Sequence, residues 1–404
     1  MLTRHLQTAL AESLADRPVV LLQGARQTGK STLARSADPA AEYLTLDDAD
    51  VLASATADPQ GFIRSRKGPA VLDEVQRLPE LFRAIKLEVD RDRRPGRFLL
   101  TGSANVMLVP RASESLAGRM EILTLFPLSQ GELAGTREQF IDAAFGPAPL
   151  PSGSATDLAP PILAGGYPEV ATALKPERRG PWFTSYISAV LQRDIRDMAA
   201  IEDVTALPRL LALLASRTAG LLNYADLARS LAIPQTTLKR YFALLEASFL
   251  VHVLQPWWTN KGLRLAKAPK VYLNDTGLAC HLMGVTAENF LAPQTPYGAL
   301  LENFVAVELM KQSSWSRVQP ALHHFRTHSG QEVDLVLESR DGRLVGIEVK
   351  ATRSVSPADF RGLATLKEAA GKRFHRGIIL YGGEHTLPFG DNLVAAPHSA
   401  LWAS

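Results

Sequence analysis

Apolar residues recur along the chain with two spacings, and the two alternate over the first 125 residues. Leu2, Leu6, Leu10 and Leu14 fall on one face of a helix. Short apolar runs follow at residues 19–22, 42–46, 69–74, 97–103 and 121–125. Buried strands that alternate with helices are typical of a parallel sheet covered on both faces. The pattern predicts an α/β domain for this part of the chain.

The middle of the chain opens with a change in composition. Residues 145–174 are dense in proline and glycine and sparse in charge, which is typical of a linker. Helical spacing returns from residue 181 to about 215. Residues 222–245 then have the pattern of two short helices around a turn at Pro234, followed by a strand at 249–254. This order resembles a helix-turn-helix with a wing.

The last third returns to an α/β pattern. An apolar helix is expected at residues 300–309, and strands at 322–326, 332–338 and 344–350. A helix at 361–370 and a strand at 376–381 complete the unit. Of the 404 residues 46% are hydrophobic and 21% are charged, which is ordinary globular usage and sufficient for two or three packed domains.

Net charge and cysteine content narrow the class of protein. A formal net charge of +3 excludes a strongly basic nucleic-acid coat, so nucleic-acid binding would need a local patch. Cys280 is the only cysteine, which suits a reducing compartment. The N-terminal segment lacks the apolar core of a signal peptide, and no run of about 18 apolar residues is present. We therefore expect a cytoplasmic protein without a membrane span.

Residues 24–32, GARQTGKST, fit the phosphate-loop pattern G-x-x-x-x-G-K-[ST] between a strand and a helix. Backbone N–H groups of such a loop point at phosphate oxygens. Lys30 would reach the β- and γ-phosphates, and the hydroxyl of Ser31 would help to hold Mg²⁺. A chance glycine turn before a surface helix is the alternative. The residues expected to bind nucleotide are Gly24, Gln27, Thr28, Gly29, Lys30, Ser31 and Thr32.

Asp73 and Glu74 follow a short apolar run, which is the pattern of a Walker B strand. Asp73 would hold Mg²⁺, and Glu74 would activate the attacking water. Paired acids at the end of a buried strand are costly unless a cation neutralises them. The alternative is that Asp73 caps a helix that begins at Val75. We expect ATP and Mg²⁺ as cofactors.

Two further groups are candidates for the same catalytic site. Ser103 ends the strand at residues 97–103 and would emerge beside the γ-phosphate, where it could position the water. Arg119 is a candidate arginine finger. It could act within one subunit or across the interface of a homo-oligomer, such as a hexameric ring, or it could be a surface arginine, and only geometry decides between them.

Basic side chains gather near the helix-turn-helix pattern. Trp257 and Trp258 are followed by a stretch with four cations, of which Lys270 is the last. A basic, aromatic wing can contact phosphates, so DNA is the expected partner. The alternative is a winged helix that serves only for packing between domains. The candidate DNA contacts are Lys239, Arg240, Lys261, Arg264 and Lys267.

Asp334, Glu348 and Lys350 form a D-x13-E-x-K pattern on two successive strands. A hairpin would bring the three together, because strand side chains on one face repeat every second residue. Two carboxylates bind Mg²⁺, and a nearby lysine can stabilise the attacking hydroxide, as in restriction-type nucleases. The alternative is that the lysine only neutralises the acids.

The chain resembles a family of ATP-binding proteins that have an AAA-type P-loop domain and a C-terminal nuclease-like domain of unknown function. The resemblance covers nearly the whole chain and is based on the motifs GARQTGKST, AVLDEVQ, LLTGSA, SLAGRM, GGYP, LNDTGL, LLENFVAVEL and QEVDLVLE with GIEVK. It implies a parallel P-loop NTPase sheet at residues 1–145, a linker and helical lid at 146–215, a winged-helix module at 216–275 and a restriction-endonuclease-like (PD-(D/E)xK) α/β domain at 290–404. It adds Glu302 to the candidate nuclease residues Asp334, Glu348 and Lys350.

Three functions are compatible with these patterns. The first is an ATP-hydrolysing protein that acts on DNA and carries a metal-dependent nuclease domain. The second is an ATP-dependent regulatory switch with an inactive nuclease-like domain. The third is a plain metal-dependent nuclease with a decaying ATPase. Glu74 favours hydrolysis over a pure switch, because a site that only binds ATP does not need a water-activating carboxylate.

Overall fold

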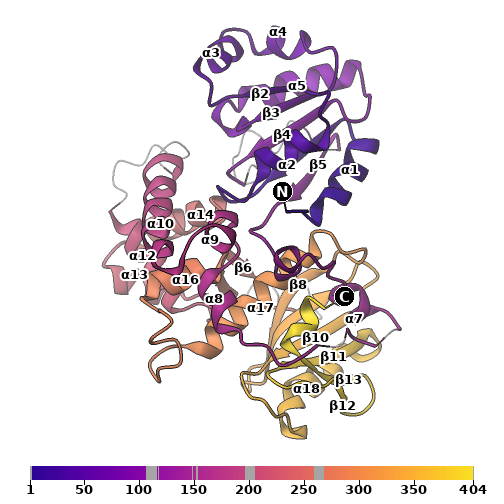
Figure 1. The fold of residues 1–404 in the computed structure, drawn as a ribbon, viewed down its shortest axis with the longest axis vertical. Helices are drawn as coiled ribbons and strands as arrows, with labels where there is room; N and C mark the ends of the chain where they lie inside the picture. The colour runs from indigo at the N-terminus through magenta and orange to yellow at the C-terminus, as the bar shows by residue number, and fades with distance from the viewer. Residues whose placement is uncertain are drawn as a thin grey trace.

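The computed structural model describes residues 2–105, 116, 118–147, 149–151, 153–195, 205–258 and 268–403. Figure 1 shows an upper lobe formed by the N-terminal part of the chain, a helical middle part and a lower lobe formed by the last third. The N-terminus lies where the upper lobe meets the rest of the molecule, and the C-terminus lies in the lower lobe. Within the described ranges no helix is both long and apolar enough to cross a membrane.

The upper lobe is a parallel sheet with helices on both faces, so the predicted P-loop α/β fold is confirmed. Its five strands have the order β2-β3-β4-β1-β5. They are β1 (Val19–Gln23), β2 (Glu42–Thr45), β3 (Ala70–Asp73), β4 (Phe98–Gly102) and β5 (Met120–Thr124). The helices are α1 (Leu6–Asp16), α2 (Lys30–Ala37), α3 (Ala49–Ala57), α4 (Pro59–Arg64), the 3₁₀ turn η1 (Val75–Arg77) and α5 (Glu80–Arg91).

The central strand β1 shows why the apolar runs are continuous rather than alternating. Val19 and Leu21 pack into the core beneath α5, whereas Val20 and Leu22 pack into the core beneath α1 and α2. Successive side chains of a strand point to opposite faces, so a strand covered by helices on both faces must be apolar at every position. The same strand ends at the phosphate loop, which this packing holds in place.

The middle part is mainly helical. The helices that follow β5 are α6 (Gln130–Ala134), α7 (Phe140–Phe145), α8 (Ala159–Ala164), α9 (Pro168–Thr172) and α10 (Pro176–Ala189), which continues as the π-helical turn η3 (Val190–Asp194). Of these, α7 lies in the lower lobe, against α17 and β11 (Figure 1). We define residues 205–273 as the hairpin module. It consists of α12 (Ala206–Ser216), α13 (Tyr224–Leu231), α14 (Gln235–Ala247) and the antiparallel pair β6 (Val251–Leu254) and β7 (Lys270–Leu273). The helix α16 (Thr276–Met283) follows it.

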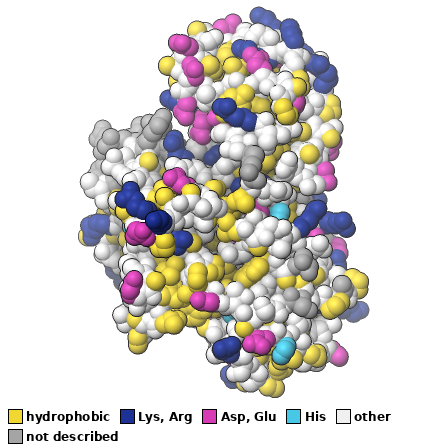
Figure 2. All heavy atoms as spheres, in the orientation of Figure 1, with side chains coloured by type: hydrophobic (Ala, Val, Ile, Leu, Met, Phe, Trp, Pro, Cys, Tyr) yellow, Lys and Arg dark blue, Asp and Glu magenta, His cyan; other side chains and the backbone are white. Residues whose placement is uncertain are grey.

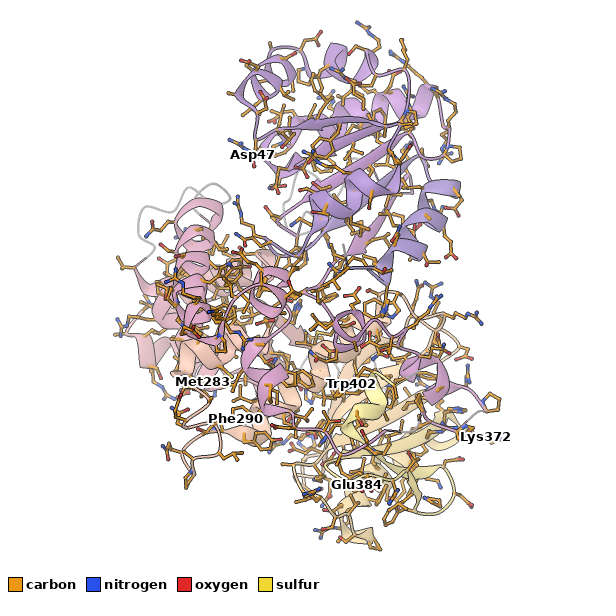
Figure 3. The ribbon with its side chains drawn as sticks, in the orientation of Figure 1. Asp47, Met283, Phe290, Lys372, Glu384 and Trp402 are labelled. Carbon is orange, nitrogen blue, oxygen red and sulfur yellow. The ribbon has the colours of Figure 1, made fainter. Side chains whose placement is uncertain are left out.

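The lower lobe contains a mixed sheet with the strand order β12-β13-β11-β10-β9-β8. The elements are α17 (Tyr297–Ser313), β8 (Ala321–Arg326), β9 (Glu332–Glu338), β10 (Leu344–Val349), η4 (Pro357–Phe360), α18 (Arg361–Ala370), η5 (Gly371–Arg373), β11 (Phe374–Tyr381), β12 (Leu387–Pro388), β13 (Leu393–Pro397) and η6 (His398–Leu401). β8, β9 and β10 are antiparallel neighbours, whereas β11 is parallel to β10. Figure 3 labels Trp402 near the chain end, where its ring packs edge-on against Phe304 of α17.

The hairpin module is joined to the lower lobe through the edge strand β8. The N–H of Trp257 donates to the carbonyl of His324 at 2.5 Å, and the N–H of His324 donates to the carbonyl of Gln255 at 3.2 Å. The Trp257 ring is fully buried and belongs to the same core as Phe325 and Val333. The end of β6 therefore extends the lower sheet, so the two parts share a core.

Candidate functional sites

The phosphate loop has the backbone that its glycines predict. Gly24 and Gly29 have φ angles of 151° and 94°, which residues other than glycine rarely adopt. A Cβ at Gly24 would lie 2.2 Å from the carbonyl oxygen of Leu125, so the close approach of the loop to that carbonyl also requires glycine. The ammonium group of Lys30 is buried and donates to the carbonyl of Ala25 at 2.8 Å. The loop therefore curls around the ammonium group of its own lysine, which is bound to a loop carbonyl.

Asp73 lies at the end of β3 and accepts hydrogen bonds from two hydroxyl groups. Ser31 donates to Oδ1 of Asp73 at 2.8 Å, and Thr101 donates to the same oxygen at 2.5 Å. Asp73 does not cap the following turn, whose N-cap residue is Glu74. The two side chains expected to hold Mg²⁺ thus meet beside the phosphate loop, and both partners of the carboxylate are neutral. This donor set of hydroxyl and carboxylate oxygens fits Mg²⁺.

Glu74 has a left-handed backbone conformation, with φ 61° and ψ 44°. Its N–H donates to the Thr101 hydroxyl at 3.1 Å, and its carboxylate accepts from Ser103 at 2.9 Å. Gln76 donates through Nε2 both to Glu74 and, at 2.9 Å, to the Ser103 hydroxyl. A non-glycine residue in this region is strained, and such strain is often found at functional sites. Gln76 was not predicted, since its contact depends on the turn η1.

Arg119 lies at the opposite end of the sheet from the phosphate loop. Met120 pairs with Val19, the first residue of β1, whereas the loop follows Gln23 at the other end of that strand. At about 3.3 Å per residue the strand separates the two by about 13 Å. The guanidinium of Arg119 forms an ion pair with Asp90 and holds the pKa of that carboxyl below its usual value. The structure therefore does not bring Arg119 to the phosphate loop of its own subunit, and a role as an arginine finger stays a prediction.

The predicted nuclease residues lie together in the lower lobe. Ile347 is opposite Leu335 in the antiparallel pair β9–β10, which places Asp334 and Glu348 beside each other. The N–H of Val349 donates to Oδ2 of Asp334 at 2.9 Å, and Lys350 donates to Glu348 at 2.9 Å. We define Glu302, Asp334 and Glu348 as the C-terminal acid cluster. One oxygen of Glu348, Oε2, is buried and has no hydrogen-bond partner.

A second lysine occupies the C-terminal acid cluster. The ammonium of Lys270 lies 2.8 Å from Oε1 of Glu302 and 3.4 Å from Oδ1 of Asp334, and its side chain is 5% exposed. Tyr272 also donates to Glu302, at 2.7 Å. The sequence pattern predicted that Trp257 and Lys270 belong to a basic, aromatic wing that contacts DNA. For these two residues the prediction is wrong. Both point inward, because β7 packs on α17 and Trp257 enters the lower core.

Burial changes the protonation of the cluster. Burial and the neighbouring charge of Asp334 raise the pKa of Glu302 to about 7 and that of Glu348 to about 8. Burial lowers the pKa of Lys270, but the charges of Glu302 and Asp334 outweigh this effect and raise it above its usual value. Among the residues that the structure describes, no group of three or more His, Cys, Asp or Glu side chains is arranged so that it could hold a metal ion. The acids of the cluster are thus paired with two lysines, Lys270 and Lys350.

The motifs GGYP and LNDTGL meet at a buried junction between the three parts. The N–H of Gly166 donates to Asp275 at 2.6 Å, and Asp275 also caps α16 by accepting from the N–H of Leu278. The N–H of Leu128 donates to the carbonyl of Gly166, and the carbonyl of Leu128 accepts from the ammonium of Lys311. These contacts therefore join the segment after β5 to α16 and α17.

Arg4 links the phosphate loop to the same junction. Its guanidinium donates to the carbonyl of Thr28 at 2.6 Å, to the carbonyl of Phe126 at 2.7 Å and to the buried carboxylate of Glu132 at 3.0 Å. No sequence signal indicated this residue, because its partners are 24 to 128 positions away.

The candidate DNA contacts are only partly described. Lys239 and Arg240 are exposed on α14, with cationic groups near the rings of Tyr224 and Tyr241. Lys261, Arg264 and Lys267 lie outside the described residues. Figure 2 shows lysine and arginine side chains in several small groups on the visible face rather than in one continuous field. The basic surface in view is thus local, as the net charge of +3 predicts.

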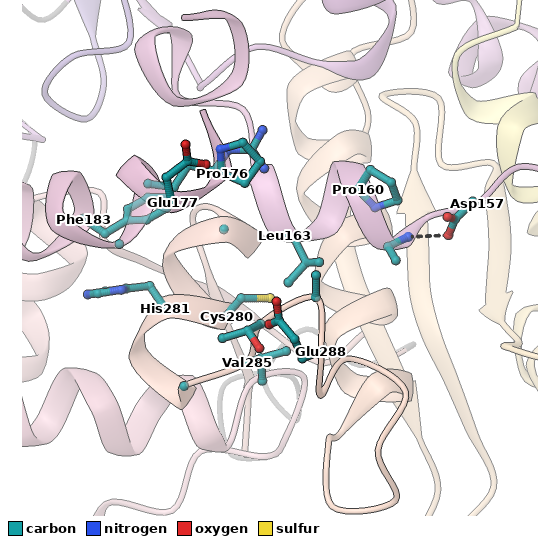
Figure 4. Close-up of a pocket in the computed structure, with 17 residues that line it drawn as sticks. Asp157, Pro160, Leu163, Pro176, Glu177, Phe183, Cys280, His281, Val285 and Glu288 are labelled. Atoms are coloured by element: carbon teal, nitrogen blue, oxygen red, sulfur yellow. Dashed lines mark hydrogen bonds between the residues drawn. The ribbon is translucent and has the colours of Figure 1, made fainter. Parts of the chain in front are cut away.

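A separate hollow of about 730 Å³ lies between α8, α10 and α16 (Figure 4). Cys280 lines it, and burial raises the pKa of this thiol to about 12. His281 is bound to the hydroxyl of Thr184 at 3.2 Å, and Figure 4 shows its ring directed away from Cys280. The thiol and the imidazole therefore do not form a nucleophile–base pair.

Three family models match successive parts of the chain. Residues 16–134 match an AAA domain, residues 156–289 match a domain of unknown function (DUF8612), and residues 297–401 match another (DUF4143). The first match agrees with the strand order and the phosphate loop. The chain therefore contains an AAA-type P-loop ATPase domain.

Whole-length similarity was found with two mycobacterial proteins. The uncharacterized protein Rv2008c of Mycobacterium tuberculosis and the uncharacterized protein Mb2031c of Mycobacterium bovis are each 35% identical over 397 residues, which cover 98% of this chain and 83% of each relative. Among solved structures, the walker-type ATPase PABY2304 of Pyrococcus abyssi has a TM-score of 0.41 and 15% identity, covering 70% of this chain and 96% of that chain. That structural likeness is too remote to carry an argument. By its sequence, the chain belongs to the same family as these two mycobacterial proteins.

Proposed function

We propose that the protein hydrolyses ATP in its upper lobe and couples this turnover to action on DNA. The observation that carries the proposal is the meeting of Ser31 and Asp73 beside the phosphate loop, with a 2.8 Å hydrogen bond between them. These oxygens would hold Mg²⁺, which neutralises charge on the phosphates when it is bound. Lys30 binds the phosphate oxygens. Glu74 accepts a proton from water, and Ser103 orients the Glu74 carboxylate.

The order of elements in the hairpin module supports DNA as the partner. Asn223 caps α13 by accepting from the N–H of Asp226, and Ala232 has the left-handed conformation that turns the chain into α14. A helix pair followed by a two-stranded hairpin is the order of a winged helix, in which the second helix contacts DNA. Lys239 and Arg240 on α14 are exposed and would contact phosphates.

The order of elements in the lower lobe supports a metal-dependent nuclease-like centre. A helix, three antiparallel strands, a second helix and a parallel strand follow each other as α17, β8–β10, α18 and β11. Asp334 and Glu348 would hold a divalent cation, and the unpartnered Oε2 of Glu348 fits that use. Lys350 would stabilise the attacking hydroxide.

A regulatory switch with an inactive nuclease-like domain is the second candidate. The observation that favours it is the buried ammonium of Lys270 between Glu302 and Asp334. A cluster neutralised in this way can serve as a structural ion-pair network.

ATP turnover with and without DNA distinguishes the two candidates. Phosphate release is measured alone and with duplex, single-stranded and branched DNA, using Lys30→Ala as the inactive variant and Lys67→Ala, at an exposed lysine of the same lobe, as its control. Stimulation by DNA supports the coupled ATPase, whereas slow turnover that DNA does not change supports the switch.

Nicking of supercoiled DNA tests the nuclease-like centre. Wild type is incubated with Mg²⁺ or Mn²⁺ beside Asp334→Ala and beside Asp391→Ala, an exposed aspartate of the same lobe. Nicking that Asp334→Ala alone abolishes supports the centre. Equal nicking by all three proteins removes Asp334 from it.

A further inference from the structure

The C-terminal acid cluster contains a cation that comes from another part of the chain. Lys270 is the first residue of β7 in the hairpin module, 32 positions before Glu302 and 64 before Asp334. Tyr272, on the same face of β7, donates to Glu302 as well. β7 therefore delivers a positive charge and a hydroxyl donor to an acid on α17.

The position of β7 is fixed on both sides. Val271 exchanges backbone hydrogen bonds with Ala219 and Gly220, and β7 pairs along its length with β6. Asn303, the neighbour of Glu302, accepts from the N–H of Leu273 at 2.8 Å and donates to its carbonyl at 3.0 Å. The ammonium of Lys270 is thus held in the cluster by backbone contacts and not only by its charge.

The charges of the cluster indicate that the ammonium of Lys270 stands in the place of a divalent cation. Glu302, Asp334 and Glu348 supply up to three negative charges, and Lys350 supplies one positive charge from the far side of Glu348. A divalent cation together with Lys350 would balance three carboxylates. Lys270 supplies one charge in place of two, and the second oxygen of Glu348 is left buried without a partner.

We propose that Lys270 competes with a divalent cation for the C-terminal acid cluster, so that the centre is closed to metal while the ammonium lies between Glu302 and Asp334. This inference rests on the proposed metal-binding use of the cluster but not on DNA cleavage. Because Lys270 belongs to the hairpin module, a ligand that displaces β7 would also withdraw the ammonium and increase the affinity of the cluster for metal. Since such coupling is reciprocal, metal in the cluster would increase the affinity for that ligand.

Mn²⁺ binding to the full chain, without nucleotide or DNA, tests the proposal. Calorimetry or the electron paramagnetic resonance of free Mn²⁺ is compared for wild type, Lys270→Met and Lys311→Met. Lys311 is the matched control, because it is an equally buried lysine that pairs with Glu308 on the same helix α17, outside the cluster. Lys270→Met should bind Mn²⁺ at least about tenfold more tightly than wild type, as expected for removal of a like charge within a few ångströms. Lys311→Met should not.

A double variant assigns the new affinity to the cluster. Lys270→Met with Asp334→Asn should lose the gain in Mn²⁺ affinity. Equal affinity in wild type and Lys270→Met overturns the proposal, as does a gain that survives Asp334→Asn. If Lys270→Met does not fold in chelator, recovery of its folded state by Mn²⁺ and not by NaCl of equal ionic strength supports the proposal, and no recovery with either overturns it.

The outcomes separate this inference from the proposed nuclease. Tighter Mn²⁺ binding by Lys270→Met without nicking of DNA supports the competition and contradicts the nuclease. Tight Mn²⁺ binding by wild type that Asp334→Asn abolishes contradicts the competition and supports the metal centre.

Discussion

The two acid sites of the chain both contain buried or largely buried carboxylates, but the carboxylates have different partners. Asp73 in the upper lobe accepts from the neutral hydroxyls of Ser31 and Thr101. Glu302 and Glu348 in the lower lobe are paired with the ammonium groups of Lys270 and Lys350. Hydroxyl donors position a carboxylate and leave its charge available to a cation, whereas a lysine neutralises it. The partner of an acid, rather than the acid itself, therefore decides whether a site is open to a cation, as beside the phosphate loop, or closed to it, as in the C-terminal acid cluster.

The largest effect is expected from removal of the P-loop lysine. Lys30→Ala should lower kcat/KM for ATP by more than about 1000-fold, because the loop then lacks the ammonium group that would contact the β- and γ-phosphates. Phosphate release and nucleotide binding are measured beside Lys67→Ala. Undiminished turnover by Lys30→Ala would mean that ATP is hydrolysed at a site other than the phosphate loop.

The next effect separates binding from hydrolysis within the upper site. Glu74→Gln should lower kcat by about 100-fold or more and leave ATP affinity close to that of wild type, because the amide cannot accept the proton from water. Single-turnover hydrolysis and equilibrium binding measure the two quantities, and Glu80→Gln, at an exposed residue of α5, is the control. Full activity of Glu74→Gln would require a different base.

The third effect concerns stability around the closed site. Burial lowers the pKa of His324 to about 3, with a further contribution from Lys270, and burial lowers that of His398 to about 4. An unfolded histidine has a pKa of about 6.5, so below this pH the unfolded chain binds protons that the folded chain does not. Each of the two histidines should therefore contribute about 2 kcal/mol less stability at pH 5 than above pH 7. Glu302 and Glu348 have raised pKa values and so contribute with the opposite sign over the same range.

Denaturant unfolding of the lower lobe between pH 7.5 and pH 5 measures this slope. The change in stability from pH 7.5 to pH 5 should be about 2 kcal/mol more favourable to the folded state in His398→Gln than in wild type, whereas His328→Asn, at an exposed position, should match wild type. An equal pH dependence in wild type and His398→Gln would show that the His398 imidazole is not buried in the neutral form.

The smallest effect concerns the orientation of the Glu74 carboxylate. Ser103→Ala removes the donor at 2.9 Å and should lower kcat by about tenfold or less, which is the value of about one hydrogen bond. ATP affinity should not change. Ser36→Ala, at an exposed hydroxyl of α2, is the matched control. A larger loss of kcat for Ser103→Ala than for Glu74→Gln would contradict the assignment of Glu74 as the base and Ser103 as the residue that orients it.

The sequence was sufficient for the features that depend on neighbouring residues. The strands of the upper sheet were predicted because each is a short apolar run between polar segments, and the loop at residues 24–32 because its glycines are needed locally. Asp334 and Glu348 were predicted to meet because a hairpin joins them.

Contacts between distant segments could not be predicted. Lys270 was read as part of a basic surface, and nothing in its local pattern indicates that β7 packs on α17. Arg4 reaches the phosphate loop and Glu132 only through the packing of the N-terminal segment. The position of Arg119 at the far end of the sheet depends on the register of β5 against β1.

We expect each chain to have one open cation site, beside the phosphate loop, and one closed site, the C-terminal acid cluster. Mn²⁺ bound per chain is counted by equilibrium dialysis in the presence of a non-hydrolysable ATP analogue, with Ser31→Ala as the variant of the open site. Wild type should bind one Mn²⁺ tightly, and Ser31→Ala should lose it. Two tightly bound ions in wild type, or one that Ser31→Ala retains, would contradict the account.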